Sequence, residues 1–393
     1  MSTETIVIVA ARRTPIGSFQ GALSSATGPD LSATATKACL ADAGIEGKDI
    51  AEALIGCVLP AGIGQAPARQ AVLASGLPQS VGTTTVNKVC GSGMKATMLG
   101  HDMVLTGSAT IVLTGGMESM TNAPYLLPKA RQGYRMGHQE VLDHMFFDGL
   151  QNPYDGNMMG YFAEETAKKY GFSREDQDAF TTESVSRAMA AINNGAFSNE
   201  IAPVTVVNRR TESVVSQDEE PPRCDLAGIA GLRPAFAKDG TVTAASSSSI
   251  SDGAASLILM RESEANRRGL QPLARIIAHA GHSHEPEWFT TAPVGAIKSV
   301  LAKAGWSATD VDLFEINEAF ACVTMAAMQD IGLDHARVNV NGGACALGHP
   351  IGASGARIIV TLIHALRNRG LRTGVASLCI GGGEAVAIAI EAV

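Results

Sequence analysis

The 393-residue sequence has few aromatic residues (5%), few charged residues (17%) and no long uninterrupted apolar run. No segment approaches the roughly 18 continuous apolar residues of a membrane-spanning helix, and no basic region precedes the first apolar segment. We therefore expect no membrane anchor and no export signal. The net charge of -8, without a Lys/Arg-rich block, argues against nucleic acid or an anionic membrane as partner. These absences favour a soluble, cytoplasmic protein.

The seven cysteines are scattered along the chain without a paired CxxC spacing. Their odd number, in a chain without an export signal, predicts free thiols rather than disulfides or structural zinc. His282 and His284 are close in sequence, but their loop favours solvated or hydrogen-bonded side chains over a metal site. Residues 62–64 do not make a dinucleotide fingerprint, because Pro67 stands where its third small residue belongs.

An internal repeat organises the rest of the chain. Residues 37–50 and 298–311 each predict a helix that ends at glycine and leads through a turn to an apolar strand. The spacing between the two copies stays constant through helix, turn and strand. Later segments follow in the same order, at 92–95 and 354–357 and at 110–116 and 375–382. Strands that alternate with helices in this way predict an α/β protein built from two duplicated halves.

Three regions follow from this repeat. Residues 1–120 form an N-terminal half, completed by about 246–270, and residues 271–393 form a C-terminal half. Residues 121–245 break the pattern and predict an inserted loop domain. Its one clear predicted helix begins at the capping pattern of Ser173 and ends near residue 194. An insertion of this kind often supplies a substrate-binding wall.

Cys90 lies where an extended segment gives way to a predicted helix that runs toward Gly107. The unpaired N–H groups and the positive dipole end of a helix N-terminus lower the pKa of a thiol. The position therefore favours a nucleophilic thiolate. Taken alone, however, the pattern is more typical of a buried structural cysteine.

Three further segments place polar or reactive groups beside glycines or at strand ends. His349 lies in the glycine-rich stretch 341–355, immediately before a predicted helix, where it is placed to act as a base. Cys379 ends an apolar strand, and the glycines that follow it offer N–H groups to an oxyanion. Asn317 follows another strand, where its amide is able to orient a water molecule or a histidine.

Together these segments resemble the signature motifs of the thiolases, and the resemblance runs from end to end. The motifs, in the family's order, are Ala-Arg-Arg-Thr-Pro-Ile-Gly at 11–17, Gly-Gln-Ala-Pro-Ala-Arg-Gln at 64–70, Cys-Gly-Ser-Gly at 90–93, Asn-Glu-Ala-Phe at 317–320, Gly-His-Pro at 348–350 and Cys-Ile-Gly-Gly-Gly at 379–383. The resemblance implies a thiolase-like fold, in which duplicated α/β halves form a layered α-β-α-β-α core with an inserted loop domain. It also implies a homodimer or a homotetramer.

The resemblance also implies a role for each residue. Cys90 becomes acylated, His349 activates it, and Cys379 moves a proton as a carbon-carbon bond forms or breaks. Asn317, through a water molecule, joins His349 in holding one thioester oxygen, and the N–H groups of Cys90 and Gly381 hold the other. The implied reaction is a reversible, ping-pong Claisen condensation or thiolysis. Coenzyme A (CoA) and acyl-CoA are its substrates, and it needs no metal or redox cofactor.

Three further positions concern substrate binding. By resemblance, Ser248 contacts the pantetheine arm, although this chain has serines at 246–249 where the family commonly has Asn-Ala-Ser-Gly. Arg223 is expected against the CoA nucleotide, although its spacing to residues 232–234 is shorter than usual. Met158 stands where short-chain biosynthetic thiolases commonly carry histidine. We expect its flexible thioether to tolerate longer or apolar acyl chains.

Two other functions stay open at this point. A beta-ketoacyl synthase shares the fold and the acylated cysteine, but it typically uses two histidines, or a histidine and an asparagine, rather than a second cysteine such as Cys379. A noncatalytic acyl-CoA or lipid-binding module would keep only the scaffold, which the presence of Cys90, His349 and Cys379 disfavours. The sequence fixes neither the preferred chain length nor the physiological direction of the reaction.

Overall fold

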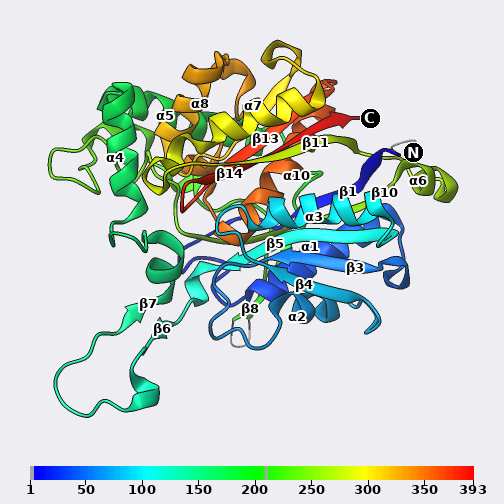
Figure 1. Cartoon of the computed structure of the whole chain (residues 1–393), viewed down its shortest axis with the longest axis horizontal. Helices are drawn as coiled ribbons and strands as arrows, with labels where there is room; N and C mark the ends of the chain where they lie inside the picture. Colours follow the sequence, from blue (N-terminus) through cyan, green and yellow to red (C-terminus); the bar gives the residue numbers. More distant parts are fainter. Residues whose placement is uncertain (1–3, 209–210) are drawn as a thin grey trace.

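Two related sheets form the framework of the molecule (Figure 1). The computed structural model describes residues 4–208 and 211–393. In the first half, β10 (Ser251–Arg261) lies antiparallel between β1 (Ile6–Arg13) and β5 (Ile111–Ser119). Strands β3 (Glu52–Gly56) and β4 (Gly82–Val86) continue this sheet in parallel beyond β5.

The second half repeats this arrangement strand by strand. β14 (Glu384–Ala392) lies antiparallel between β11 (Ala274–Ser283) and β13 (Thr373–Ile380). β12 (Leu313–Ile316) pairs in parallel with β13, as β3 does with β5. An isolated parallel bridge beyond β12 stands where β4 pairs with β3 in the first half. This shared topology confirms the predicted duplication.

A short pairing joins the two sheets. Ile6 of β1 lies opposite Ile276 of β11, and Ile8 lies opposite Ala274, in antiparallel register. Because of this pairing the strands form one continuous 10-stranded sheet. The repeat predicted that the halves pack against one another, but not that they share backbone hydrogen bonds.

Helices lie between and outside the two halves of the sheet (Figure 1). α3 (Ser92–Thr106) and α10 (Ile351–Arg369) contact each other and strands of both halves. α1 (Gly28–Ala43) covers the outer face of the first half, and α7 (Ala292–Ala304) covers that of the second. Residues of α10 are buried from Ile351 to Leu366, as expected of a helix that is surrounded by protein. These layers confirm the predicted α-β-α-β-α core.

The segment between β5 and β10 leaves the layered core. α5 (Arg174–Asn193) begins at a capping box made by Ser173 and Asp176, as predicted. α4 (Met159–Tyr170) precedes it and was not predicted, because no side chain caps its N-terminus. Strands β6 and β7 form a hairpin that extends away from the body (Figure 1). The boundaries of the inserted domain stay a prediction.

The described chain has two further general features. No helix in the described part of the chain has both the length and the apolar character needed to cross a membrane. All seven cysteines are free thiols.

Several shorter elements complete the fold. They are β2 (Gly17–Ser18), α2 (Pro67–Ala74), β6 (Tyr125–Leu126), β7 (Leu142–Asp143), β8 (Val204–Asn208), β9 (Thr211–Val215), α6 (Glu262–Arg268), α8 (Ala321–Ile331) and α9 (Ala344–Leu347).

Candidate active site

A cavity of about 220 Å³ opens where the inserted segment meets the two halves of the core. Its walls are mostly apolar, with a small number of polar groups, as is typical of a small-molecule site. Arg223 and Asn317 are not among its lining residues in the described ranges. The lining residues that the sequence singled out are Cys90, Met158, Ser248, His349, Cys379 and Gly381.

Cys90 lies in the turn between β4 and α3. The residue before it, Val89, has a φ of 45°, a left-handed conformation that is uncommon for a β-branched side chain. Ser92 holds this turn, because its hydroxyl accepts from the Lys88 N–H at 2.9 Å and donates to the Val89 carbonyl at 2.6 Å. This strained turn places the Cys90 thiol on the wall of the cavity.

The pKa of Cys90 differs from the sequence prediction. Burial raises the pKa of Cys90 to about 11, although the backbone N–H groups of Gly381 and of Cys90 itself hydrogen-bond the sulfur and lower it. The predicted net lowering was therefore wrong, because the loss of water around the sulfur outweighs the backbone donors. Near neutral pH this thiol is protonated, and a protonated thiol acts as a nucleophile only after a base has removed its proton.

The ring of His349 is held through one of its two nitrogens. Its Nδ1 lies 2.5 Å from the hydroxyl oxygen of Ser354, and that hydroxyl donates to the Pro350 carbonyl at 3.0 Å. Since the single hydroxyl proton is used on Pro350, Ser354 accepts from Nδ1–H, and the lone pair of the ring lies on Nε2. Nε2 is buried and has no hydrogen-bond partner among the described residues. Burial, with a smaller effect of Arg357, lowers the pKa of His349 to about 3, so the ring is neutral.

Cys379 lies near the end of β13, beside the turn that carries Cys90. Gly91 allows this approach, because a Cβ at that position would overlap the side chain of Ile380. Burial raises the pKa of Cys379 well above its usual range, and the nearby sulfur of Cys90 raises it further. Both thiols therefore line one cavity, and burial favours the protonated form of each.

Asn317 is fully buried behind this cavity. Its Oδ1 accepts from the Arg357 guanidinium at 3.3 Å. Its Nδ2 has no hydrogen-bond partner within the described ranges. A buried amide donor without a partner is costly, so this group is available to a water molecule. The structure is compatible with the predicted water-mediated role, which stays a prediction.

The comparisons with known proteins agree along the whole chain. The family model described as "Thiolase, N-terminal domain" matches residues 6–263, and "Thiolase, C-terminal domain" matches residues 270–392. The chain belongs to the thiolase family. It is 51% identical over 387 residues to the acetyl-CoA acetyltransferase of Escherichia coli, with 98% of each chain covered. It is 48% identical over 388 residues to that of Chromobacterium violaceum, covering 98% of this chain and 99% of the relative.

Two solved structures are also similar to this thiolase along its whole length. The Bacillus anthracis acetyl-CoA acetyltransferase superposes with a TM-score of 0.97 at 42% identity, covering 100% of this chain and 99% of the other. A thiolase from Ascaris suum in complex with coenzyme A gives a TM-score of 0.94 at 42% identity, covering 99% and 100%. These matches confirm the predicted thiolase fold.

Ser248 and Met158 lie on two different segments of the chain that line this thiolase's cavity. The Ser248 hydroxyl donates to the Ala319 carbonyl at 3.0 Å, so this serine is anchored to the segment that follows Asn317. Met158 immediately precedes α4 and lines the cavity together with Met159 and other apolar side chains. A flexible thioether at this point gives the wall an adaptable apolar surface.

Arg223 lies apart from the cavity. Its Nη1 donates to the Ser18 hydroxyl at 2.9 Å and lies 3.2 Å from Glu219. Its side chain is 59% exposed, so it remains accessible to a ligand on the outer surface. The structure does not bring Arg223 to the other predicted site residues, and its contact with a nucleotide stays a prediction.

Two important polar groups were missed in the sequence. Ser354 was seen only as part of a repeated helix start, although it lies five residues after His349, in the first turn of α10, where its hydroxyl reaches the ring. Glu118 is buried and accepts from three backbone N–H groups, one of them that of Gly352 at the start of α10. Burial raises the pKa of Glu118 to about 7. A buried carboxylate after an apolar strand was the available signal.

Proposed function

We propose that this thiolase is an acetyl-CoA C-acetyltransferase or acetyl-CoA C-acyltransferase. It joins two acetyl-CoA molecules into acetoacetyl-CoA and CoA, or cleaves 3-ketoacyl-CoA, through an acyl-Cys90 intermediate. The observation that carries the proposal is the convergence of Cys90, His349 and Cys379 on one cavity. Relatives named acetyl-CoA acetyltransferase, nearly half identical over almost the whole chain, support the same reaction. CoA and acyl-CoA are the substrates, and the chemistry requires no metal or redox cofactor.

The first half-reaction acylates Cys90. As its sulfur attacks the thioester carbonyl, Nε2 of His349 takes the thiol proton. The negative charge that develops on the carbonyl oxygen is held by the N–H groups of Cys90 and Gly381, the two donors that hydrogen-bond the sulfur in the empty site. The carbon-sulfur bond to CoA then breaks. CoA leaves with the proton of Cys379, so Cys379 becomes a thiolate and His349 remains protonated.

The second half-reaction makes the carbon-carbon bond. The Cys379 thiolate takes a proton from the methyl carbon of acetyl-CoA. Protonated His349, with a water molecule held by Asn317, stabilises the resulting enolate oxygen. The enolate carbon attacks the acyl group, and the bond from that group to Cys90 breaks. The departing sulfur recovers its proton from His349, so all groups return to their starting state, and thiolysis reverses each step.

Separate substitutions of the two thiols test this division of labour. Cys90→Ser should abolish CoA-dependent cleavage of acetoacetyl-CoA and also the exchange of labelled CoA into acetyl-CoA. Cys379→Ser should abolish cleavage, yet some acylation of Cys90 should still be detectable, because the nucleophile and His349 remain. Equal loss of acylation in both variants, with both still folded, would contradict the assignment.

The apolar wall at Met158 bears on substrate range. We propose that this thiolase accepts acyl chains longer than acetyl, since the methionine and its neighbours present an adaptable apolar surface. Rates across a ladder of 3-ketoacyl-CoA chain lengths test the proposal, with Met158→His as the matched variant. The variant should favour acetoacetyl-CoA more strongly than the wild type does. Wild-type activity confined to acetoacetyl-CoA would refute the idea.

Assembly and location follow from the family and the sequence rather than from the cavity. We propose a homodimer or a homotetramer, which light scattering coupled to size-exclusion chromatography distinguishes from a monomer. The cytoplasmic location stays a prediction, and fractionation of the source cells tests it.

A further inference from the structure

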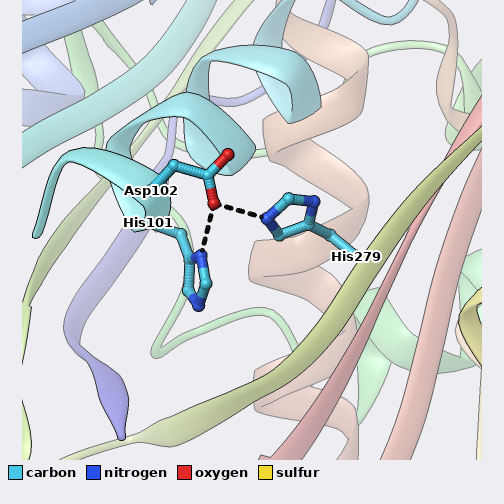
Figure 2. Close-up of side chains that lie close together, drawn as sticks. All are labelled: His101, Asp102 and His279. Atoms are coloured by element: carbon cyan, nitrogen blue, oxygen red, sulfur yellow. Dashed lines mark hydrogen bonds and ion pairs between the residues drawn. The ribbon is translucent and has the colours of Figure 1, made fainter. Parts of the chain in front are cut away.

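A cluster of two imidazoles and one carboxylate lies outside the cavity (Figure 2). His101 and Asp102 are consecutive residues on α3, whereas His279 lies on β11 of the other half. Asp102 Oδ1 is 3.0 Å from His101 Nδ1 and 2.9 Å from His279 Nε2. Figure 2 shows both rings turned toward this one oxygen. Side chains from both halves of the chain thus meet at a single point.

The cluster has the composition of a transition-metal site. Imidazole nitrogen and carboxylate oxygen are the ligands that Zn²⁺ and similar divalent ions take, commonly with three protein ligands and a water molecule. The three possible ligand atoms all lie within 4.8 Å of one another. In a tetrahedral site with bonds near 2.0 Å, any two ligand atoms lie about 3.3 Å apart. The two contacts that Asp102 makes with the imidazole nitrogens are only slightly shorter than this separation.

Accessibility fits an ion that enters from solvent. The Asp102 side chain is half exposed, whereas those of His101 and His279 are only 13% and 17% exposed. The two rings are therefore held in place, since their centroids lie 5.0 Å apart in an edge-to-face contact, while the carboxylate remains open to water. The three ligand atoms already lie within 4.8 Å of one another, and the half-exposed carboxylate gives an ion a route from solvent.

We propose that His101 Nδ1, Asp102 Oδ1 and His279 Nε2 bind one divalent transition-metal ion of the zinc type, with water completing its coordination. In the metal-free protein both ring nitrogens donate to the carboxylate. On binding, the nitrogen of each ring that faces Asp102 gives up its proton and coordinates the ion, so the ion replaces the two hydrogen bonds. The ion ties α3, which follows Cys90, to β11, and its role is structural rather than catalytic.

Lys303 gives this site a built-in test. Its Nζ donates to the backbone carbonyl of His279 at 3.0 Å, so a positive charge lies near the proposed ion. That charge opposes a bound cation. Lys303→Gln should therefore bind the ion more tightly than the wild type, whereas loss of a ligand should weaken binding.

Two other sets of side chains carry nitrogen or sulfur atoms that could compete for an added metal ion, and the experiment has to exclude binding there. Cys90, Cys379 and His349 offer sulfur and nitrogen ligands in the cavity. His282 and His284 lie with ring centroids 5.2 Å apart, and they form the matched pair without a carboxylate. The protein is therefore used without an affinity tag, with Cys90 replaced by Ser, and with His282→Gln as a control.

Titration of metal-free protein with Co²⁺ and Zn²⁺ tests the proposal. One Co²⁺ per chain should give visible d-d absorption without a sulfur charge-transfer band, and one Zn²⁺ should displace it and raise the melting temperature. His279→Gln and Asp102→Asn should each weaken binding by more than about tenfold, which is the scale seen even for outer-sphere changes. His282→Gln should bind as tightly as the parent.

The opposite pattern overturns the proposal. If His279→Gln and Asp102→Asn bind Co²⁺ as tightly as the parent, the ion lies elsewhere. If the parent binds no ion at micromolar concentration, the cluster is only a hydrogen-bonded contact between the two halves. Thermal unfolding of each variant without metal shows whether it is folded, so that lost binding is not confused with lost structure.

Discussion

Ser354→Ala is the most informative single change in the cavity. The variant removes the hydroxyl that accepts from Nδ1 of His349 and leaves the ring otherwise in place. Without that acceptor, the buried ring loses the contact that keeps its lone pair on Nε2. A buried donor left without a partner costs about 1–3 kcal/mol. If that cost falls on the competent ring state, the rate of Cys90 acylation falls by about 5-fold to about 150-fold.

A single-turnover assay with acetyl-CoA measures this rate directly. The acylation rate should fall while the affinity for acetyl-CoA stays within about twofold, because Ser354 does not line the cavity. Ser251→Ala is the matched control, since its hydroxyl contacts the backbone N–H of His349 at 3.3 Å and not the ring. Ser354→Thr keeps the hydroxyl and should recover much of the rate.

Two results would refute the reasoning on Ser354. The first is an unchanged acylation rate in a folded Ser354→Ala protein, which would mean that the ring needs no partner on Nδ1. The second is an equal loss in Ser251→Ala, which would place the effect in the backbone of the loop. A lower melting temperature with a normal rate would assign Ser354 to stability alone.

Three further changes test other parts of the structure. Gly91→Ala should abolish cleavage of acetoacetyl-CoA in a folded protein, because the new Cβ overlaps the side chain of Ile380 and moves Cys90. Activity near that of the wild type would contradict the close approach of Ile380 to Gly91. Glu118→Gln should lower the free energy of unfolding, measured by chemical denaturation, by about 2–3 kcal/mol. Both carboxylate oxygens of Glu118 accept backbone N–H groups, and the amide of the variant turns its own donor toward one of these groups. No change in the free energy of unfolding would show that the carboxylate is dispensable. The pKa of His349 is lowered to about 3 in the folded protein, so between about pH 3 and 6.5 the unfolded chain binds more protons and stability falls as pH falls. From pH 7 to 5 the wild type should therefore lose about 2 kcal/mol more than His349→Gln does, and equal losses would mean that the ring is protonated when folded.

The duplicated core was predictable because each copy carries its own local signals. A helix that ends at Gly44 and its counterpart that ends at Gly305 both use a left-handed glycine cap, which the sequence shows directly. The pairing of β1 with β11 has no such signal, since it depends on how the finished halves meet. α4 was missed for a similar reason, because this helix starts at Met159 without a side-chain cap and depends on packing.

That Cys90, His349 and Cys379 line a cavity was predictable for a different reason. Cys90, His349 and Cys379 stand beside glycines or at strand ends, where the backbone is shaped for a ligand. The protonation states were not predictable, because the pKa of Cys90 depends on how much water the folded cavity excludes.

Contacts between distant residues were also beyond the sequence. The His279 ring meets Asp102 only once the two halves have packed, and neither residue stands in a recognisable motif. His282 and His284 are close in sequence, and their rings contact each other, but among the described residues they are not part of a group with a carboxylate. Proximity in sequence was therefore a poor guide to a possible metal site.

Mass spectrometry after a brief exposure to acetyl-CoA tests the central claim most directly. Digestion of the trapped protein should place one acetyl group on the peptide that contains Cys90, and Cys90→Ser should carry none. An acetyl group found on Cys379 or another cysteine, or no adduct in an enzyme that still cleaves acetoacetyl-CoA, would contradict the account.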